Sequence, residues 1–262
     1  MATRVIVLGS GTCVPRRRRG PSGYVVETDE HLVLIDSGSG TLGRLAQTGL
    51  DYRRLTHALY THTHTDHTAD LGPLLFALNY TPGFERRETL HLVGPPGFDR
   101  FLEQLSQLWP WIRPRGDWLE RREIADGSLE WPGLELRSKP VEHGGIPANA
   151  YRLETGDCSI VFSGDTRYCP AIVEIARGAD LLIIEASLPQ GPEGTDAHLT
   201  AAQAGRVAAE AEVSKLILTH LYPACDEEDM VALCRREFAG EIAIAEDQME
   251  LPVDSDLWGH NT

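Results

Sequence analysis

The sequence lacks the features that mark several large classes of protein. Its uninterrupted apolar runs, such as 181–184 and 216–218, fall far short of the roughly 20 residues that a membrane-spanning helix requires. Only 24 lysines and arginines face 39 acidic residues, and the formal net charge of −15 argues against general attraction to nucleic acid or anionic membranes. The five cysteines include no Cys-x-x-Cys pair, so neither a disulfide framework nor a zinc knuckle is expected. No membrane is therefore expected as a partner.

What the chain does contain is ordinary globular composition. Its 262 residues, 42% hydrophobic and 24% charged, can bury a large core without disulfides. We find no repeat, low-complexity tract or long linker, so a single domain over 1–262 is predicted. The apolar residues before Gly9 are too few for the core of a signal peptide and instead predict a first strand. A cytoplasmic location is expected.

Short runs rich in Val, Ile and Leu alternate with helix-like stretches along the whole chain. The predicted strands are 4–8, 24–28, 32–36, 57–61, 90–93, 134–139, 150–154, 160–163, 181–185, 215–219 and 241–245. The predicted helices are 40–48, 66–77, 97–108, 170–177, 201–212 and 227–238. Thr200 and Gln203 form a capping-box pattern at the start of the fifth helix. The alternation predicts an α/β domain in two sheet-bearing halves with helices outside.

The stretch 109–122 does not follow this alternation. It interleaves three tryptophans with four arginines and carries prolines at 110 and 114. Two interpretations stay open. The stretch is either a surface excursion whose aromatic side chains pack on the domain, or a substrate-facing lid or stacking surface for a base or aromatic ring.

The strongest chemical signal is the segment His62-Thr-His64-Thr-Asp66-His67, which follows an apolar strand and precedes a helix-like run. Alternate residues of an extended chain point the same way, so His62 and His64 can reach one cation. Asp66 and His67 lie where the chain turns into the helix and can reach a second cation nearby. Imidazoles and a carboxylate at this density suit a borderline metal such as zinc.

A His-x-His-x-Asp-His motif at the end of a strand resembles the metallo-β-lactamase superfamily. The resemblance implies a four-layer αββα sandwich with a two-metal site at the strand ends. It continues along the chain, because Val-Glu-His143-Gly, Ser-Gly-Asp165-Thr and Leu-Thr-His220 resemble the family's later ligand positions. It implies two Zn²⁺ ions, with Mn²⁺ or Fe²⁺ as alternatives. The implied ligands are His62, His64 and His143 for the first metal, Asp66, His67 and His220 for the second, and Asp165 between them.

Two positions separate branches of this superfamily. True β-lactamases usually carry a cysteine where this chain has Asp165, which disfavours antibiotic hydrolysis. Di-iron flavoprotein oxygen reductases typically carry a glutamate where this chain has His64, which disfavours electron transfer. Together they favour a redox-inert zinc hydrolase.

Further segments resemble the ribonuclease Z-like branch. Asp36-Ser-Gly-Ser-Gly-Thr is similar to its Asp-Cys-Gly-Glu-Gly-Thr segment, and the resemblance implies that Asp36 holds the histidine loop in place. His198-Leu-Thr resembles its His-Ser-Thr motif, and Ile-Glu185-Ala-Ser resembles its His-Glu-Ala-Thr motif. The implied catalytic groups are Asp66 and a His198 oriented by Glu185, which stabilises charge or protonates the leaving alkoxide.

The segment Pro-Arg-Arg17-Arg-Arg19-Gly resembles the Pro-x-Lys-x-Arg-Asn motif of the same branch. The resemblance implies that Arg17 or Arg19 binds the substrate phosphate, whereas a run of charges taken alone predicts a solvated loop. One difference concerns transfer RNA. Ribonuclease Z carries a long RNA-gripping arm between the third histidine and the bridging aspartate, but here only 144–164 lie between them, enough for a hairpin of two strands.

The predicted function is that of a zinc-dependent phosphodiesterase that uses a dimetal-activated hydroxide on a small-molecule or short phosphodiester. The missing arm and the acidic charge make transfer RNA an unfavourable substrate. The alternatives are a ribonuclease Z-like RNA-processing endonuclease, a lactone, thioester or sulfate-ester hydrolase at the same site, and a catalytically idle metal-binding or interaction module. Assembly into a homodimer stays open.

Overall fold

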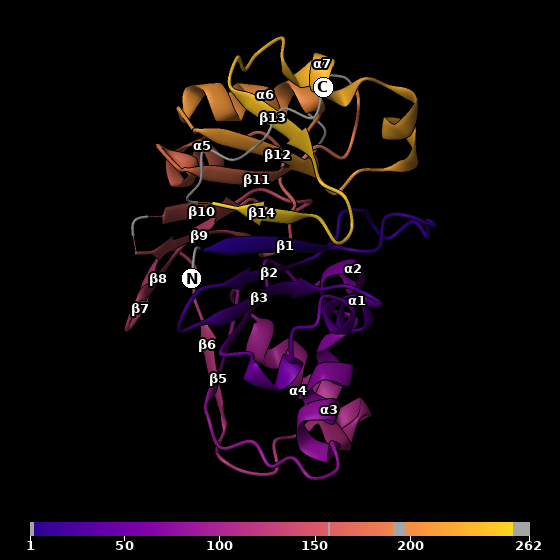
Figure 1. The fold of residues 1–262 in the computed structure, drawn as a ribbon, viewed down its shortest axis with the longest axis vertical. Coiled ribbons are helices and arrows are strands. Elements are labelled where there is room, and N and C mark those ends of the chain that lie inside the picture. The colour runs from indigo at the N-terminus through magenta and orange to yellow at the C-terminus, as the bar shows by residue number, and fades with distance from the viewer. Residues whose placement is uncertain (1–2, 157, 191–196, 254–262) are drawn as a thin grey trace.

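The computed structural model describes residues 3–156, 158–190 and 197–253, which form two β-sheets between layers of helices (Figure 1). The first sheet has seven strands, in the order β14-β1-β2-β3-β4-β5-β6. Pairing is antiparallel from β14 to β3 and parallel from β3 to β6. The strands are β1 (Arg4–Gly9), β2 (Gly23–Glu27), β3 (Leu32–Ser37), β4 (His57–Leu59), β5 (Leu90–Gly94), β6 (Leu119–Glu123) and β14 (Glu250–Pro252).

The second sheet also has seven strands, in the order β13-β12-β11-β10-β9-β8-β7. Its strands β10 to β13 run parallel, and β7 to β10 pair antiparallel. The antiparallel pair β9–β10 is the hairpin predicted between His143 and Asp165. The strands are β7 (Gly127–Trp131), β8 (Leu134–Pro140), β9 (Asn149–Thr155), β10 (Cys158–Phe162), β11 (Leu181–Glu185), β12 (Lys215–Thr219) and β13 (Glu241–Ile244).

The helices cover the outer faces of the sheets. Those on the first sheet are α1 (Thr41–Gln47), α2 (Thr65–Thr68), α3 (Leu71–Tyr80) and α4 (Phe98–Leu108). Those on the second are α5 (Pro170–Ala176), α6 (Ala201–Glu210) and α7 (Met230–Cys234). Short 3₁₀ turns are η1 (Tyr52–Arg54), η2 (Pro110–Ile112) and η3 (Pro223–Glu227). The predicted capping box of α6 is present, with Thr200 accepting from Gln203 N and the Gln203 side chain accepting from Thr200 N.

Three apolar cores separate the four layers. Val5 and Val7 of β1 face the core between the sheets, whereas Ile6 and Leu8 face the helices, as the two-residue period of a strand requires. A third core lies between the second sheet and α5, α6 and α7. Strands buried on both faces explain the nearly continuous Val, Ile and Leu runs of the sequence. The predicted αββα sandwich is confirmed.

Several predicted boundaries are wrong. The helix expected over 66–77 is two helices, α2 and α3, separated at 69–70, and the helix expected over 227–238 is reduced to α7 after a 3₁₀ turn. Strands β6, β7 and β14 were not predicted. β6 and β7 are edge strands with mostly exposed or partly exposed residues, so they lack the apolar run that marks a central strand. β6 also occupies the end of the stretch 109–122.

Of the five cysteines, Cys13 is exposed and the other four are buried, and all are free thiols, as the sequence predicts. Among the residues described, no helix has the length and apolar character needed to cross a membrane. The single-domain boundary and the cytoplasmic location stay predictions.

Candidate metal centre

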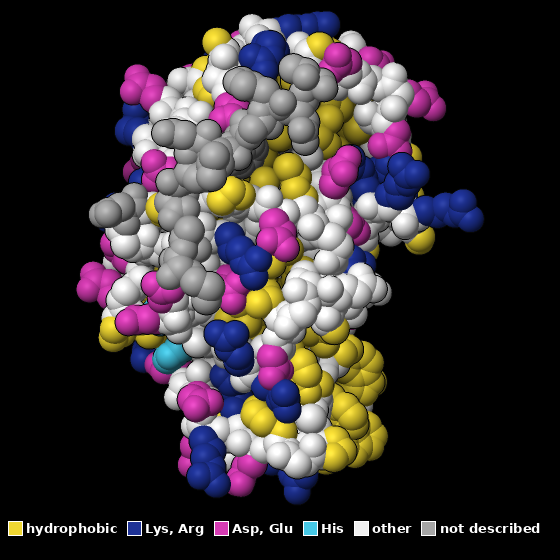
Figure 2. Space-filling view, viewed as in Figure 1, with side chains coloured by type: hydrophobic (Ala, Val, Ile, Leu, Met, Phe, Trp, Pro, Cys, Tyr) yellow, Lys and Arg dark blue, Asp and Glu magenta, His cyan; other side chains and the backbone are white. Residues whose placement is uncertain are grey.

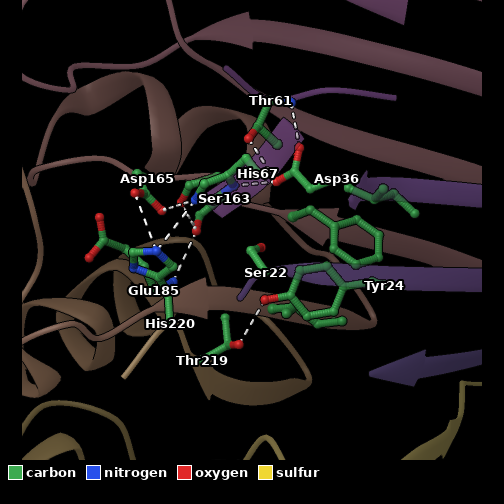
Figure 3. A pocket seen from close by; sticks show the side chains of 14 residues that line it. Ser22, Tyr24, Asp36, Thr61, His67, Ser163, Asp165, Glu185, Thr219 and His220 are labelled. Atoms are coloured by element: carbon green, nitrogen blue, oxygen red, sulfur yellow. Dashed lines mark hydrogen bonds and ion pairs between the residues drawn. The ribbon is translucent and has the colours of Figure 1, made fainter. Parts of the chain in front are cut away.

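The predicted ligands lie at one edge of the sandwich, where strands of both sheets end. His62 follows β4, Asp165 follows β10, and His220 follows β12. Beneath them the hydroxyl of Tyr24 on β2 lies 2.7 Å from Oγ1 of Thr219 on β12, so a direct hydrogen bond joins the two sheets (Figure 3). The topology therefore gathers side chains from distant parts of the chain.

One group of four side chains comprises His62, His64, His143 and Asp165, whose potential ligand atoms lie within 4.8 Å of one another. Nε2 of His143 is 3.2 Å from Nδ1 of His64, and Nε2 of His62 is 3.8 Å from Oδ2 of Asp165. Two nitrogens bound at 2.0–2.1 Å to a tetrahedral zinc ion would be about 3.3 Å apart. The spacing therefore suits one shared cation.

A second group comprises Asp66, His67 and His220, again within 4.8 Å. Nε2 of His220 lies 3.4 Å from Nε2 of His67 and 3.5 Å from Oδ2 of Asp66. Asp165 reaches both groups, with Oδ1 3.4 Å from Nε2 of His67 and Oδ2 3.7 Å from Nε2 of His143. Its carboxylate therefore lies between the two groups of side chains.

The electrostatics of this cluster fit bound metal. Nε2 of His62 is buried and has no hydrogen-bond partner among the described residues, a costly arrangement unless a ligand occupies it. Burial alone would lower the pKa of His67, but the charges of Asp165 and Asp36 outweigh it and raise that pKa well above its usual value. Positive charge is therefore favoured between these carboxylates, and a cation supplies it as well as a proton does.

Asp36 holds the histidine loop, as the sequence predicts. Its Oδ2 lies 2.6 Å from Nδ1 of His67, and its carboxylate accepts hydrogen bonds from the backbone N–H and hydroxyl of Thr61, both at 2.9 Å (Figure 3). The Thr61 hydroxyl also lies 3.1 Å from Nδ1 of His62. These contacts fix the ring orientation and leave Nε2 of each histidine facing the cluster.

Two further anchors are not evident from the sequence. Nδ1 of His143 lies 2.8 Å from the carbonyl oxygen of Ala197, and Nδ1 of His220 lies 3.0 Å from Oγ of Ser187. Every residue has a backbone carbonyl, so the sequence does not show which carbonyl contacts His143. The only signal for Ser187 was its place two residues after Glu185.

Two of the four non-glycine residues that have a positive φ in the described part of the chain lie at this centre. Asp36 and His220 both adopt φ of 54°, in the left-handed region that non-glycine residues rarely occupy. Such conformations cost about 1–3 kcal/mol each and persist where the surroundings hold them. Here the hydrogen bonds to Thr61, His67 and Ser187 do so.

His198 and Glu185 form the predicted pair. Nδ1 of His198 lies 3.0 Å from Oε1 of Glu185, whose buried carboxylate also accepts from the backbone N–H of Thr166 at 2.7 Å and from Oγ of Ser187 at 2.6 Å. The His198 ring stacks on that of His220 with centroids 5.7 Å apart and planes at 25°. The pair is therefore rigid and lies against the candidate ligands.

Burial lowers the pKa of His198, but the hydrogen bond and charge of Glu185 outweigh this effect and raise it to about 9. The neighbouring carboxylates thus favour the imidazolium form of His198. A ligand atom of His198 also lies within 4.8 Å of those of Asp165 and His220, so His198 is closer to the ligand set than its position beside a helix start predicts.

The two arginines predicted to bind substrate differ in their surroundings. Nη1 of Arg19 donates to Oγ of Ser10 at 3.0 Å and to the carbonyl of Ala245. These hydrogen bonds hold the loop of residues 16–19 in place. Arg17 is exposed and lines a cavity of about 700 Å³ together with its neighbouring arginines. The substrate role stays a prediction for both; of the two side chains, Arg17 is the exposed one.

Comparisons with known proteins agree with this fold. Residues 31–221 match the model of the beta-lactamase superfamily domain. A ribonuclease Z of Mycobacterium avium is 31% identical, covering 96% of this chain and 98% of its own. The metallo-beta-lactamase fold protein YhfI from Bacillus subtilis superimposes with a TM-score of 0.81 at 27% identity, covering 96% of this chain and 99% of its own. A diphosphatase from the PhnP family gives 0.68 at 22% identity, covering 95% and 97%. The chain therefore belongs to the beta-lactamase superfamily, as a metal-dependent hydrolase homologous to ribonuclease Z.

Proposed function

We propose that the protein is a dimetal phosphodiesterase acting on small-molecule or short phosphodiesters. The observation that carries the proposal is the His198–Glu185 pair, a buried carboxylate that holds a cationic imidazole beside two groups of metal-ligating side chains. Hydrolysis of a phosphodiester needs both a proton donor for the leaving oxygen and positive charge around the phosphate. This edge of the sandwich offers residues for both.

The metal ligands in this proposal are His62, His64 and His143 for one cation, Asp66, His67 and His220 for the other, and Asp165 for both. When bound, two divalent cations, zinc by preference with Mn²⁺ or Fe²⁺ as alternatives, would supply water activation at neutral pH and neutralise phosphate oxygens. The donor set of imidazoles and carboxylates suits these metals.

Asp66 positions the attacking water. Burial raises the pKa of Asp66, but the hydrogen bond from His220 and the nearby His67 outweigh this and lower it. The side chain is therefore an ionised acceptor, and it is only partly buried, so solvent can reach it. A carboxylate in this state accepts a hydrogen bond from a water molecule and orients its lone pair toward phosphorus.

His198 serves the leaving group. Because Nδ1 is engaged by Glu185, Nε2 carries the proton available to substrate. As the oxygen of a hydroxide bonds to phosphorus and the ester P–O bond breaks, this proton passes to the departing alkoxide. Glu185 stabilises the imidazolium before this transfer and keeps the ring in place.

Arg17, which is exposed, binds a non-bridging phosphate oxygen in this proposal. A forked guanidinium contact suits phosphate geometry. Loss of this contact should raise KM more than it lowers kcat, because it acts on ground state and transition state alike.

A second candidate, RNA processing, is favoured by the identity with ribonuclease Z over nearly the whole chain. Against it, the described residues 144–156 and 158–164 form the β9–β10 hairpin and its flanking loops, and the net charge of −15 repels a polyanion. We therefore rank a precursor transfer RNA below a small diester.

The experiment is a turnover screen of zinc-loaded protein against bis-p-nitrophenyl phosphate, a lactone, a thioester, an aryl sulfate and a precursor transfer RNA. We expect turnover of the diester, little of the three other small esters, and no site-specific cleavage of the RNA. Efficient cleavage of the RNA by the protein alone would establish the second candidate instead. A preference for lactone, thioester or sulfate would refute both.

A further inference from the structure

Tyr222 adjoins the candidate metal centre but takes no part in the proposed function. It lies two residues after His220, in the connection that follows β12, and is partly exposed. Its ring centroid is 5.9 Å from that of His198 and 6.2 Å from that of His220, with the ring planes at 72° and 89°. The ring is therefore nearly perpendicular to those of the proposed proton donor and of a candidate metal ligand.

The backbone around Tyr222 is fixed by hydrogen bonds to several parts of the chain. Its N–H donates to the carbonyl of Ser187 at 3.4 Å, and its carbonyl accepts from the N–H of Cys225 at 2.9 Å. Sγ of Cys225 donates to the same Ser187 carbonyl at 3.2 Å. Nη1 of Arg16 donates to the carbonyl of Leu221 at 3.1 Å. The side chain of Tyr222 therefore projects from a fixed position, as orienting a substrate requires.

The hydroxyl of Tyr222 has only a weak partner within the protein. Among the residues that the structure describes, it contacts only Sγ of Cys13, at 3.8 Å. By contrast, the hydroxyls of Tyr24, Tyr60 and Tyr151 each lie within 2.8 Å of an oxygen atom. Thiols are weak hydrogen-bonding groups, and a phenol keeps its proton at neutral pH, so the Tyr222 hydroxyl can donate to a stronger acceptor.

The hydroxyl end of Tyr222 lies against the segment between β1 and β2. Cys13 belongs to that segment, which also carries the arginines at 16–19. Figure 2 shows dark-blue side chains projecting at the right of the view, where the indigo segment after β1 lies in Figure 1. A phosphate that contacts both Arg17 and His198, as in the proposed function, therefore lies beside Tyr222, whose ring packs on His198 and whose hydroxyl reaches this segment.

The surroundings of Tyr222 suit an anion. The segment that its hydroxyl contacts carries four consecutive arginines, although the chain as a whole has a net charge of −15. Arg16 forms an ion pair with Asp226, whereas Arg17 and Arg18 are exposed. Exposed guanidinium groups beside a neutral hydroxyl donor match the oxygens of a phosphate better than an uncharged lactone or thioester.

We propose that Tyr222 is a further substrate-binding residue, whose hydroxyl donates a hydrogen bond to a non-bridging oxygen of the phosphodiester. This inference rests on the proposed function, in which His198 protonates the leaving oxygen. In phosphoryl transfer the charge of the transition state is spread over the equatorial oxygens, and a donor that is already in place stabilises that charge. Tyr222 keeps its own proton throughout, so no covalent bond of this side chain forms or breaks.

The test compares wild type with Tyr222→Phe, which removes the hydroxyl and keeps the ring, on an alkyl diester and a nitrophenyl diester. The matched control is Tyr168→Phe, which removes a hydroxyl that donates to Glu210 on α6. We expect Tyr222→Phe to lower kcat about 10-fold or more, the effect of losing one hydrogen bond to a charged group, with a smaller change in KM. The loss should be equal on the two diesters, because the contact is to a non-bridging oxygen and not to the leaving group. Metal content and circular dichroism should not change.

A Tyr222→Phe variant that equals the control, or that loses metal, would overturn the proposal. So would a loss that is larger on the alkyl diester, because it would show that Tyr222 acts through the proton of His198. Calorimetry with orthovanadate on the zinc-loaded proteins tests the contact without turnover, and we expect Tyr222→Phe, but not Tyr168→Phe, to raise its Kd about 10-fold. If wild type hydrolyses no diester, the proposed function fails, and this vanadate affinity alone decides whether Tyr222 binds an oxyanion.

Discussion

The imidazole of His198 and the carboxylate of Glu185 meet at 3.0 Å, with Glu185 buried and His198 partly exposed beside the candidate metal ligands. The carboxylate is fully engaged by Thr166, Ser187 and His198. These contacts fix the direction of the His198 ring and favour its imidazolium form before the proton is transferred. Because of this contact with Glu185, His198 is suited to donate a proton, whereas the other histidines of the site are candidate metal ligands.

Replacing His198 by alanine should reduce kcat by about 10² to 10⁴, the usual effect of losing a general acid or charge-stabilising donor. The loss should be smaller for a nitrophenyl diester than for an alkyl diester, because a good leaving group needs less help from a proton. The measurement compares both substrates on both proteins, with metal content determined in parallel. Thr200 still caps α6 in the variant, so the fold is maintained. Equal losses would point to oxyanion contact instead, and lost metal would place His198 among the ligands.

Elemental analysis after mild metal loading should find two transition-metal ions per chain. His220→Ala removes an imidazole from the second group but leaves His62, His64 and His143 intact, so this variant should keep about one ion. The matched control is His31→Ala, a histidine outside both groups, which should keep two. A wild-type stoichiometry near one that His220→Ala does not alter would contradict the dimetal assignment.

Asp36→Asn should weaken the second metal site selectively. The carboxylate that faces Nδ1 of His67 at 2.6 Å would become an amide, and loss of such an outer partner typically costs 10–100-fold in metal affinity. Competition with a chelator measures both sites. Two sites weakened equally would mean that Asp36 acts by holding the whole loop through Thr61 and not through His67.

Acid should destabilise the fold through His57. This buried ring stacks on His91 at 4.9 Å, lies 5.3 Å from His31, and packs edge-on against Trp131; its pKa falls to about 3 because of burial and these two histidines. Glu120, 3.1 Å from His91, is the acidic group facing the cluster.

Because the folded-state pKa of His57 is depressed below the unfolded value of about 6.5, its contribution to stability is present above pH 6.5 and is lost as the pH falls toward 3. Denaturant unfolding between pH 7 and pH 4 should therefore show a shallower loss for His57→Phe than for wild type, by up to a few kcal/mol. Metal loss affects both proteins alike, so the difference isolates His57. Parallel pH profiles would rule out this role.

The sequence predicted the central strands and the candidate ligands, because both produce a recognisable local pattern of residues. β11 and β12 are found at their predicted bounds, since strands buried on both faces are apolar throughout. Edge strands β6 and β7 were not predicted, because their solvent-exposed positions carry charged side chains and no apolar run marks them. The break between α2 and α3 was missed because Thr68, Ala69 and Asp70 carry no proline or glycine.

Contacts between residues far apart in the chain could not be predicted from any local sequence pattern. The carbonyl of Ala197 that holds His143 and the tyrosine–threonine contact beneath the site depend on how the two sheets meet. The exposure of Trp109 and Trp111 likewise depends on the path fixed by Asn79. The composition of residues 109–122 identified this stretch as unusual but did not predict which of its aromatic rings are exposed.

The division of the ligating side chains between the two halves of the chain has a consequence for biosynthesis. His62 to His67 leave the ribosome early, whereas His220 emerges only when most of the chain is made, and β14 pairs with β1 later still. Early folding can build part of the first sheet, but neither cation site is complete on such a nascent chain. We expect the protein to acquire metal after translation. Cells starved of metal should therefore accumulate finished, inactive polypeptide that zinc addition reactivates without new synthesis.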